Sequence, residues 1–289
     1  MTHRLLPPGN RAPVRVLAGL EALDPPAKKI AKKVRDLTKP RPVKEALSGS
    51  WLGHPLHPVL TDITIGTFTS AVLLDWLGGK RSRPATERLI ALGLASTLPT
   101  VASGYSDWAD TEVASDAVRR IGIVHSAANA TASWLFAASL VARRRGGSGR
   151  ALALAGGATL VGSGYLGGHM TFAEGVGVDQ TTFEQPTDEW TAVLDDASLG
   201  EGEARCVEAG GTAVMLVRRE GALYALSNRC SHRGGPLHEG ELDGLTVHCP
   251  WHDSVFDLRD GALVHGPAAF PQPAWDTRVQ EGRIEVRRR

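Results

Sequence analysis

The sequence lacks the motifs of several large enzyme classes. It has no phosphate-binding loop, no glycine fingerprint of a dinucleotide-binding fold and no Ser-His-Asp order typical of a hydrolase. No nucleic-acid-binding motif accompanies its basic residues, and the formal net charge of the chain is only +1. We therefore expect neither nucleotide-dependent chemistry nor triad hydrolysis, and no nucleic-acid partner.

Cysteine is also scarce, with three residues in 289. Two of them lie in similar short motifs, Cys230-Ser231-His232 and Cys249-Pro250-Trp251-His252. If both bind a metal, Cys206 has no cysteine left for a disulfide, which is consistent with a reducing compartment. We expect Cys206 to be a small buried residue on a strand.

The alternating order Cys230, His232, Cys249, His252 predicts a metal centre. Two thiolates on one iron and two imidazoles on the other are the ligands of a Rieske [2Fe–2S] cluster. Neutral imidazoles raise the reduction potential and can couple proton transfer to electron transfer. The alternative is a tetrahedral zinc site, but zinc fingers place two cysteines together and then two histidines. The alternation favours the cluster, and with it electron transfer.

The region around these motifs resembles the Rieske ferredoxin-like family, from about Trp190 to Arg289. The resemblance extends to further segments of the sequence, namely Gly221–Leu226, Pro236-Leu237, Ser254-Val255-Phe256-Asp257 and Gly266-Pro267-Ala268. It implies a small antiparallel β-structure in which the ligand histidines face outward. It also implies that four residues lie around the cluster without ligating it: Ser254, Trp251, Gly266 and Pro267. Independently, the short apolar runs on either side of Arg218–Gly221 predict a hairpin.

Two departures from the family pattern are informative. Rieske subunits of cytochrome bc-type complexes have a disulfide-forming cysteine in each ligand loop, where this chain has Gly235 and Trp251. Those subunits also have a tyrosine where this chain has Phe256. Fewer hydrogen bonds to the cluster sulfurs lower its potential, so we expect a potential at the low end of the Rieske range.

The chain before this domain has a different composition, rich in Ala, Gly, Leu, Ser and Thr. A helix of roughly 17–25 residues spans the hydrocarbon core of a bilayer. Four apolar stretches approach or reach that length: Val59–Leu77, Leu89–Tyr105, Ile121–Ala142 and Ala151–Gly168. The alternative is a soluble helical bundle. The uncharged third stretch and the glycine-rich fourth favour four transmembrane helices.

This helical region resembles a family of bacterial multi-pass membrane domains known as domain of unknown function 2231. The resemblance is carried by His54-Pro55-Leu56-His57-Pro58, by Ser103–Trp108 and by Gly167-Gly168-His169. The family name implies no activity. The expected fold is thus multidomain, an all-α four-helix transmembrane bundle followed by an all-β Rieske domain.

An up-and-down order of four helices would bring several ionisable residues to one side of the membrane: His54, His57, Asp107, His125 and His169. Ionisable residues at such positions usually mark a cofactor or an ion path. A haem b with two histidine ligands is one hypothesis for them, and a quinone or metal site is another. In the remaining alternative, the histidines lie in interfacial water. We expect Asp75, near the end of the first helix, to be interfacial or paired with another helix.

The expected domains are a basic, proline-containing tail (1–50), the transmembrane domain (51–172), a linker (173–189) and the Rieske domain (190–289). Ala27–Leu37 in the tail predicts a basic helix, either amphipathic on anionic headgroups or simply solvated. Basic loops after the first and third helices favour an external Rieske domain, whereas the basic tail favours a cytoplasmic one. No secretory or twin-arginine signal is visible. We therefore expect a multi-pass protein of the cell membrane with a cytoplasmic Rieske domain.

Three function classes fit the sequence. The first is a membrane-anchored carrier of single electrons between a haem or quinone and an oxidoreductase partner. The second is a ferredoxin serving a separate Rieske oxygenase, because only 37 residues follow His252 and no iron-binding oxygenase domain is present among them. The third is a redox sensor without turnover.

Overall fold

The computed structural model describes residues 12–289, which form two compact units. The helical unit contains the described residues up to Pro40 together with Leu56–Val176. The β-rich unit contains Arg41–Pro55 and Gly177–Arg289. A helical region thus precedes a β-rich one. The β-rich unit also takes residues 41–50 of the predicted tail and residues 51–55 of the predicted transmembrane domain. Residues 1–11 of that tail lie outside the described part of the chain.

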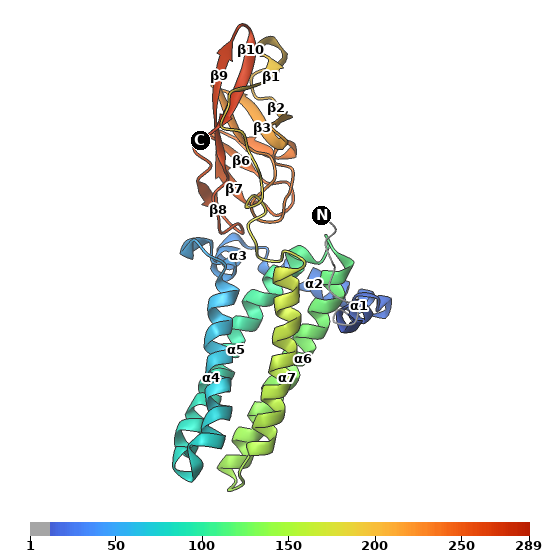
Figure 1. Ribbon diagram of the computed structural model, residues 1–289, viewed down its shortest axis with the longest axis vertical. Helices are drawn as coiled ribbons and strands as arrows, with labels where there is room; N and C mark the ends of the chain where they lie inside the picture. Colours follow the sequence, from blue (N-terminus) through green and yellow to red (C-terminus); the bar gives the residue numbers. More distant parts are fainter. Residues whose placement is uncertain (1–11) are drawn as a thin grey trace, which may run out of the picture. The chain divides into compact units, whose positions relative to one another are not determined.

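Four long helices run side by side in the helical unit (Figure 1): α4 (Leu56–Leu77), α5 (Arg83–Thr111), α6 (Asp116–Arg144) and α7 (Arg150–Phe172). They contain all four predicted apolar stretches. The side chain of Ser115 caps α6 by accepting a hydrogen bond from the Val118 N–H at 3.3 Å. Helix α4 packs against α5, and α6 packs against α7.

Small residues allow these helices to approach closely. Phe68 on α4 stacks on Phe136 of α6 with ring centroids 4.0 Å apart. A Cβ atom on Gly93 would lie 2.6 Å from the Phe68 ring, and one on Gly156 would lie 3.1 Å from the Phe136 ring. The two glycines therefore leave room for the aromatic pair at the centre of the four helices.

A buried ion pair joins α4 to α6. The Arg143 guanidinium donates two hydrogen bonds to the Asp75 carboxylate, one of them at 2.9 Å. Only 2% of the Arg143 side chain and 7% of the Asp75 side chain are exposed. The prediction that Asp75 pairs with another helix is confirmed.

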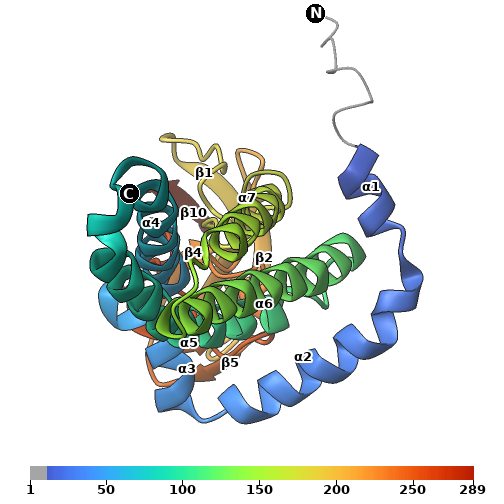
Figure 2. The same cartoon turned by 90° about the horizontal axis from the view of Figure 1, so that it is seen from below.

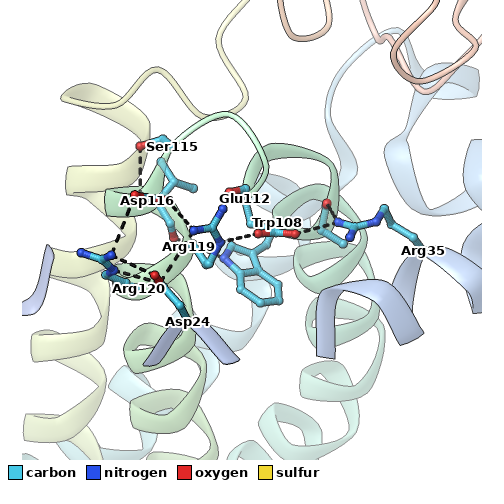
Figure 3. A network of polar contacts seen from close by, with 10 residues as sticks. Asp24, Arg35, Trp108, Glu112, Ser115, Asp116, Arg119 and Arg120 are labelled. Carbon is cyan, nitrogen blue, oxygen red and sulfur yellow. Dashed lines mark hydrogen bonds and ion pairs between the residues drawn. The ribbon is translucent and has the colours of Figure 1, made fainter. Parts of the chain in front are cut away.

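Two shorter helices, α1 (Ala12–Ala18) and α2 (Asp24–Thr38), lie along the outside of the long ones (Figure 2). A polar network fixes α2 (Figure 3). The buried Glu112 accepts hydrogen bonds from Arg35 of α2 at 2.9 Å and from Arg119 at 2.6 Å. At the start of α2, Asp24 accepts two hydrogen bonds from Arg120, both at 2.9 Å.

By length and apolar composition, α5 alone among the helices of the described region qualifies as a candidate membrane span. The sequence predicted four membrane spans, and for α4, α6 and α7 this stays a prediction.

The β-rich unit contains two antiparallel sheets. The larger has the strand order β1-β10-β9-β4-β3-β2, and the smaller has the order β5-β6-β7-β8. The strands of the larger sheet are β1 (Thr191–Asp195), β2 (Ala204–Ala209), β3 (Thr212–Arg219), β4 (Ala222–Ser227), β9 (Ala274–Gln280) and β10 (Arg283–Arg288). Those of the smaller are β5 (Glu241–Asp243), β6 (Thr246–His248), β7 (Val255–Asp257) and β8 (Leu263–His265). The unit also contains helix α3 (Arg41–Ser48).

The predicted hairpin is confirmed. Strands β3 and β4 pair in antiparallel register, and Glu220 and Gly221 between them both have positive φ, 53° and 74°. Cys206 lies on a strand, as expected, but the prediction that it is buried is wrong. It belongs to β2, an edge strand of the larger sheet, and its side chain is exposed.

Candidate metal centre

Two loops between strands carry the predicted ligands. In the loop after β4, the Cys230 N–H donates to the Gly235 carbonyl at 2.9 Å. In the loop after β6, the Cys249 N–H donates to the Ser254 carbonyl at 2.8 Å, and the Asp253 N–H donates back to the Cys249 carbonyl at 3.0 Å. Each cysteine therefore sits at the start of a tight, hydrogen-bonded turn that holds the following histidine nearby.

The two loops bring the four predicted ligands together. Cys230 and Cys249 are both buried in one core cluster of the β-rich unit. The imidazole rings of His232 and His252 lie edge to face with their centroids 5.1 Å apart, and their Nδ1 atoms are buried. The structure therefore pairs cysteine with cysteine and histidine with histidine, and no three metal-ligating side chains of the described residues form a site for a single metal ion. Two ligands of one kind per iron is the arrangement that a Rieske cluster needs.

Local electrostatics suit metal binding by these groups. A hydrogen bond from the Cys230 thiol, together with the backbone N–H groups of Trp251 and His252, lowers the pKa of Cys249 to about 7. The bond to Cys249 and burial raise the pKa of Cys230. Burial lowers the pKa of His232, so its ring stays neutral. A thiolate stabilised by backbone N–H groups and a neutral imidazole are the forms that bind metals.

Gly235 and Trp251 occupy the positions where related high-potential proteins have a disulfide, and the two residues are in contact. A Cβ atom on Gly235 would lie 3.1 Å from the Trp251 ring and 2.9 Å from the Cys249 sulfur. The indole therefore covers the space that a side chain at position 235 would need. Trp251 is still 51% exposed and lies beside the His252 ring, with centroids 6.5 Å apart.

A third loop, after β8, is tied to both ligand loops. The Ser254 hydroxyl oxygen accepts a hydrogen bond from the Ala268 N–H at 2.9 Å. The Ser231 hydroxyl donates to the Phe270 carbonyl at 3.0 Å, and the buried Gln272 accepts from the Ser231 N–H at 2.9 Å. We call residues 266–272 the cover loop. The family resemblance predicted Gly266, Pro267 and Ser254 as residues around the cluster. Gln272 was not predicted, because a single glutamine between two prolines forms no recognisable motif.

Residues 41–55 also pack against the cover loop, which the sequence analysis did not anticipate. The Glu45 carboxylate lies 2.9 Å from the Nδ1 atom of His265, the residue just before that loop. A Cβ atom on Gly266 would lie 2.7 Å from the Ser50 side chain, so Ser50 packs closely against this glycine. The His54 and Phe270 rings lie edge to face at 6.2 Å. These contacts join residues more than 200 positions apart, and no local pattern in the sequence signals them.

The predicted membrane-side residues occupy several places. His57 and His125 lie in the helical unit, and both side chains are half-buried. Asp107 is in α5, and the His169 ring lies 3.6 Å from the Glu174 carboxylate. His54 belongs to the β-rich unit. His57, His125 and His169 contact residues outside this set, so a common site for the five stays a prediction.

The rings of His57 and His125 are each oriented by a backbone carbonyl. The Nδ1 atom of His57 lies 3.0 Å from the Thr100 carbonyl, and the Nδ1 atom of His125 lies 2.9 Å from the Ser163 carbonyl. The Nε2 atom of His125 lies 3.0 Å from the Asn129 side-chain nitrogen, which donates to it.

Two family models match the chain. One, described as a Rieske [2Fe-2S] domain, matches residues 189–276, and the other, described as a predicted membrane protein (DUF2231), matches residues 53–180. Together they account for both units of the fold.

The C-terminal region is similar to several known proteins. It is 32% identical to ferredoxin CarAc of Metapseudomonas resinovorans over 98 residues, which is 34% of this chain and 92% of that protein. It is 33% identical to human apoptosis-inducing factor 3 over 96 residues, but the match spans only 16% of that protein and 33% of this chain. The solved ferredoxin of carbazole 1,9a-dioxygenase from Nocardioides aromaticivorans IC177 is 32% identical, with a TM-score of 0.33 over 35% of this chain and 98% of its own.

Proposed function

We propose that this protein is a membrane-anchored carrier of single electrons. The chain belongs to the Rieske [2Fe–2S] family through residues 189–276 and to the DUF2231 family through residues 53–180. A Rieske domain implies electron transfer, and the relatives named as ferredoxins support that assignment. The observation that carries the proposal is the convergence of two thiols and two imidazoles from two loops.

In this proposal, Cys230 and Cys249 hold one iron of a [2Fe–2S] cluster, and His232 and His252 hold the other. The cluster supplies reversible one-electron chemistry when bound. The chain supplies backbone N–H groups to the Cys249 sulfur, neutral imidazoles, and a cover loop whose Ala268 packs in the same core cluster as both cysteines. The exposed Trp251, beside the half-buried His252, is the proposed route to a redox partner.

Support for membrane insertion comes from the outer surface of the four long helices. Large apolar side chains are exposed there, including Leu98 (74%), Trp134 (76%) and Val161 (76%). Further exposed members of this surface are Val59, Ile63, Leu73, Trp76, Leu92, Leu154 and Phe172. A surface of this kind is costly in water and favourable in lipid. We therefore propose that α4–α7 all span the bilayer and that the redox domain lies on the cytoplasmic side, in keeping with the basic N-terminal helix.

The potential of the cluster should lie toward the low end of the range of about −150 to +300 mV. Phe256 is fully buried in the core cluster that contains Cys230 and Cys249, and it brings no hydroxyl. Phe256→Tyr should raise the midpoint potential if the new hydroxyl donates to a ligand sulfur. Redox titration followed by EPR measures the change, with Phe256→Leu as the control that adds no donor. A wild-type midpoint near the top of the range would contradict this reasoning.

A haem or quinone site in the helical unit is a second proposal. It is favoured by the orientation of His57 and His125, whose Nδ1 atoms both face backbone carbonyls and leave Nε2 as the possible ligand atom. In His125 a ligand at Nε2 would have to replace the hydrogen bond from Asn129. For haem b, we expect a dithionite-reduced b-type absorption band that disappears in His125→Ala while the cluster signal persists. Asn129→Ala, which removes only the neighbour of Nε2, should keep the band. A folded, haem-free protein from haem-sufficient cells would leave the quinone site as the remaining candidate.

The rate of electron exchange with a partner distinguishes the membrane carrier from two other roles, a ferredoxin for an oxygenase and a redox sensor. A ferredoxin for a separate oxygenase must pass electrons to that enzyme, whereas a sensor need not exchange electrons rapidly with any partner. Stopped-flow mixing of the reduced full-length protein with quinone, or with a Rieske oxygenase, measures this exchange directly. Rapid oxidation by quinone supports the membrane carrier, and rapid oxidation by the oxygenase alone supports the ferredoxin role. Slow exchange with both supports the sensor.

A further inference from the structure

Helix α2 is fixed rigidly at one end of the helical unit. Near its C-terminus, Arg35 donates to the Ala109 carbonyl at 2.6 Å and to the Glu112 carboxylate at 2.9 Å (Figure 3). Near its N-terminus, Asp24 binds Arg120. The hydrogen bonds from Arg120 lower the pKa of Asp24 to about 2, so its carboxylate stays charged. The eleven positions between Asp24 and Arg35 correspond to about 16 Å of helix. Helix α2 is therefore bound near both ends to the segment 109–120, which comprises the end of α5, the connection and the start of α6.

The two faces of α2 differ in character. Ala27 and Ala31 are fully buried, and with the half-buried Val34 they pack in the cluster that contains Trp108. The exposed residues of the helix include four lysines, Lys28, Lys29, Lys32 and Lys33. Two exposed apolar residues, Ile30 (37%) and Leu37 (65%), lie on the same helix. We call the exposed residues Lys28, Lys29, Ile30, Lys32, Lys33 and Leu37 the lysine face.

The charge of the lysine face is not cancelled by the helix itself. Helix α2 has two acidic residues. Asp24 forms an ion pair with Arg120, and Asp36 is exposed. The remaining cation, Arg35, is bound to Glu112. The exposed part of α2 thus carries four lysines, one carboxylate (Asp36) and two large apolar residues, Ile30 and Leu37. This combination of ammonium groups and apolar side chains suits the boundary between headgroups and acyl chains.

We propose that the lysine face of α2 is a binding surface for the headgroups of anionic phospholipids. The inference rests on the proposed membrane insertion of α4–α7, because the connection that holds α2 would then lie at the membrane surface. The lysine ammonium groups would bind lipid phosphates, and Ile30 and Leu37 would enter the interface between them. Anionic lipid is favoured as the occupant by charge complementarity, since zwitterionic headgroups carry no net charge to attract the four lysines.

The test compares the binding of phosphatidylglycerol and phosphatidylcholine by the full-length, detergent-solubilised protein, using native mass spectrometry. Wild type should prefer phosphatidylglycerol, and the preference should weaken as salt rises. The variant K28Q/K29Q/K32Q/K33Q should bind phosphatidylglycerol roughly tenfold more weakly. The matched control R205Q/R278Q/R283Q/R289Q removes the same charge from exposed positions on the β-rich unit and should retain the preference. Unchanged phosphatidylglycerol binding in the lysine variant would overturn the proposal, and this is the result expected if the lysine face binds an acidic protein instead. An equal loss of binding in the control variant would also overturn it.

Failure of the membrane proposal itself can be recognised separately. After extraction of cell membranes with alkaline carbonate, both wild type and the lysine variant should stay in the membrane pellet, because the lysine face adds to the anchorage of α4–α7 without replacing it. Release of wild type would refute the membrane span. Retention of both proteins with no preference for phosphatidylglycerol would refute only the lipid surface.

Discussion

Replacing His252 with cysteine is expected to abolish the Rieske signal of this protein. The change puts a third thiolate on the cluster, which adds negative charge and removes an imidazole. The EPR spectrum should lose the low average g value of mixed thiolate and imidazole ligation. The midpoint potential of any cluster that remains should fall toward the roughly −400 mV of all-thiolate ferredoxins.

The control for this experiment is a histidine of the same domain outside the ligand set. His238 follows the first ligand loop and lies 3.0 Å from the Asn228 side chain rather than facing the cysteines. His238→Cys introduces the same thiol nearby and should preserve the signal. If His252→Cys keeps the wild-type line shape and potential, His252 does not ligate the cluster.

Arg143→Leu is expected to destabilise the helical unit by about 3–5 kcal/mol. It leaves the Asp75 carboxylate buried between α4 and α6 without the guanidinium that donates two hydrogen bonds to it. A buried, uncompensated charge is among the most destabilising single changes known. The free energy of unfolding, measured by denaturant titration of the detergent-solubilised protein, reports the loss.

The double variant Asp75→Leu with Arg143→Leu separates charge from packing. Replacing both partners with apolar residues removes the unpaired charge, so it should restore most of the stability lost in Arg143→Leu. Arg283→Leu breaks the exposed pair with Asp195 and should cost less than about 1 kcal/mol. Equal losses in the single and double variants would show that packing, not charge, dominates at this position.

Much of the architecture follows from local patterns in the sequence. The four long helices contain the four apolar stretches, and the β3–β4 hairpin forms where Arg218–Gly221 separates two apolar runs. The alternating cysteines and histidines predict a pair of matched loops, and the structure brings their side chains together. Periodicity and motif spacing are short-range signals, so they identify elements and ligand loops without any knowledge of tertiary contacts.

The features that sequence reasoning missed depend on long-range contacts. The pairing of Asp75 with another helix was predicted, but its partner Arg143, 68 positions away, was not. Glu45 contacts His265 at a separation of 220. Gln272 is hydrogen-bonded to the segment 227–231, more than 40 positions before it. Cys206 is exposed because its strand lies at a sheet edge, which depends on the order of strands rather than on its neighbours in sequence.

The most direct test of membrane-anchored electron transfer by a Rieske cluster is a combined EPR and metal analysis of wild-type protein purified in detergent from carbonate-washed membranes. We predict two irons and two acid-labile sulfides per chain, with a reduced-state EPR signal of low average g value. Stoichiometric zinc with no iron or sulfide would contradict the proposal and assign Cys230, His232, Cys249 and His252 to a structural zinc site instead.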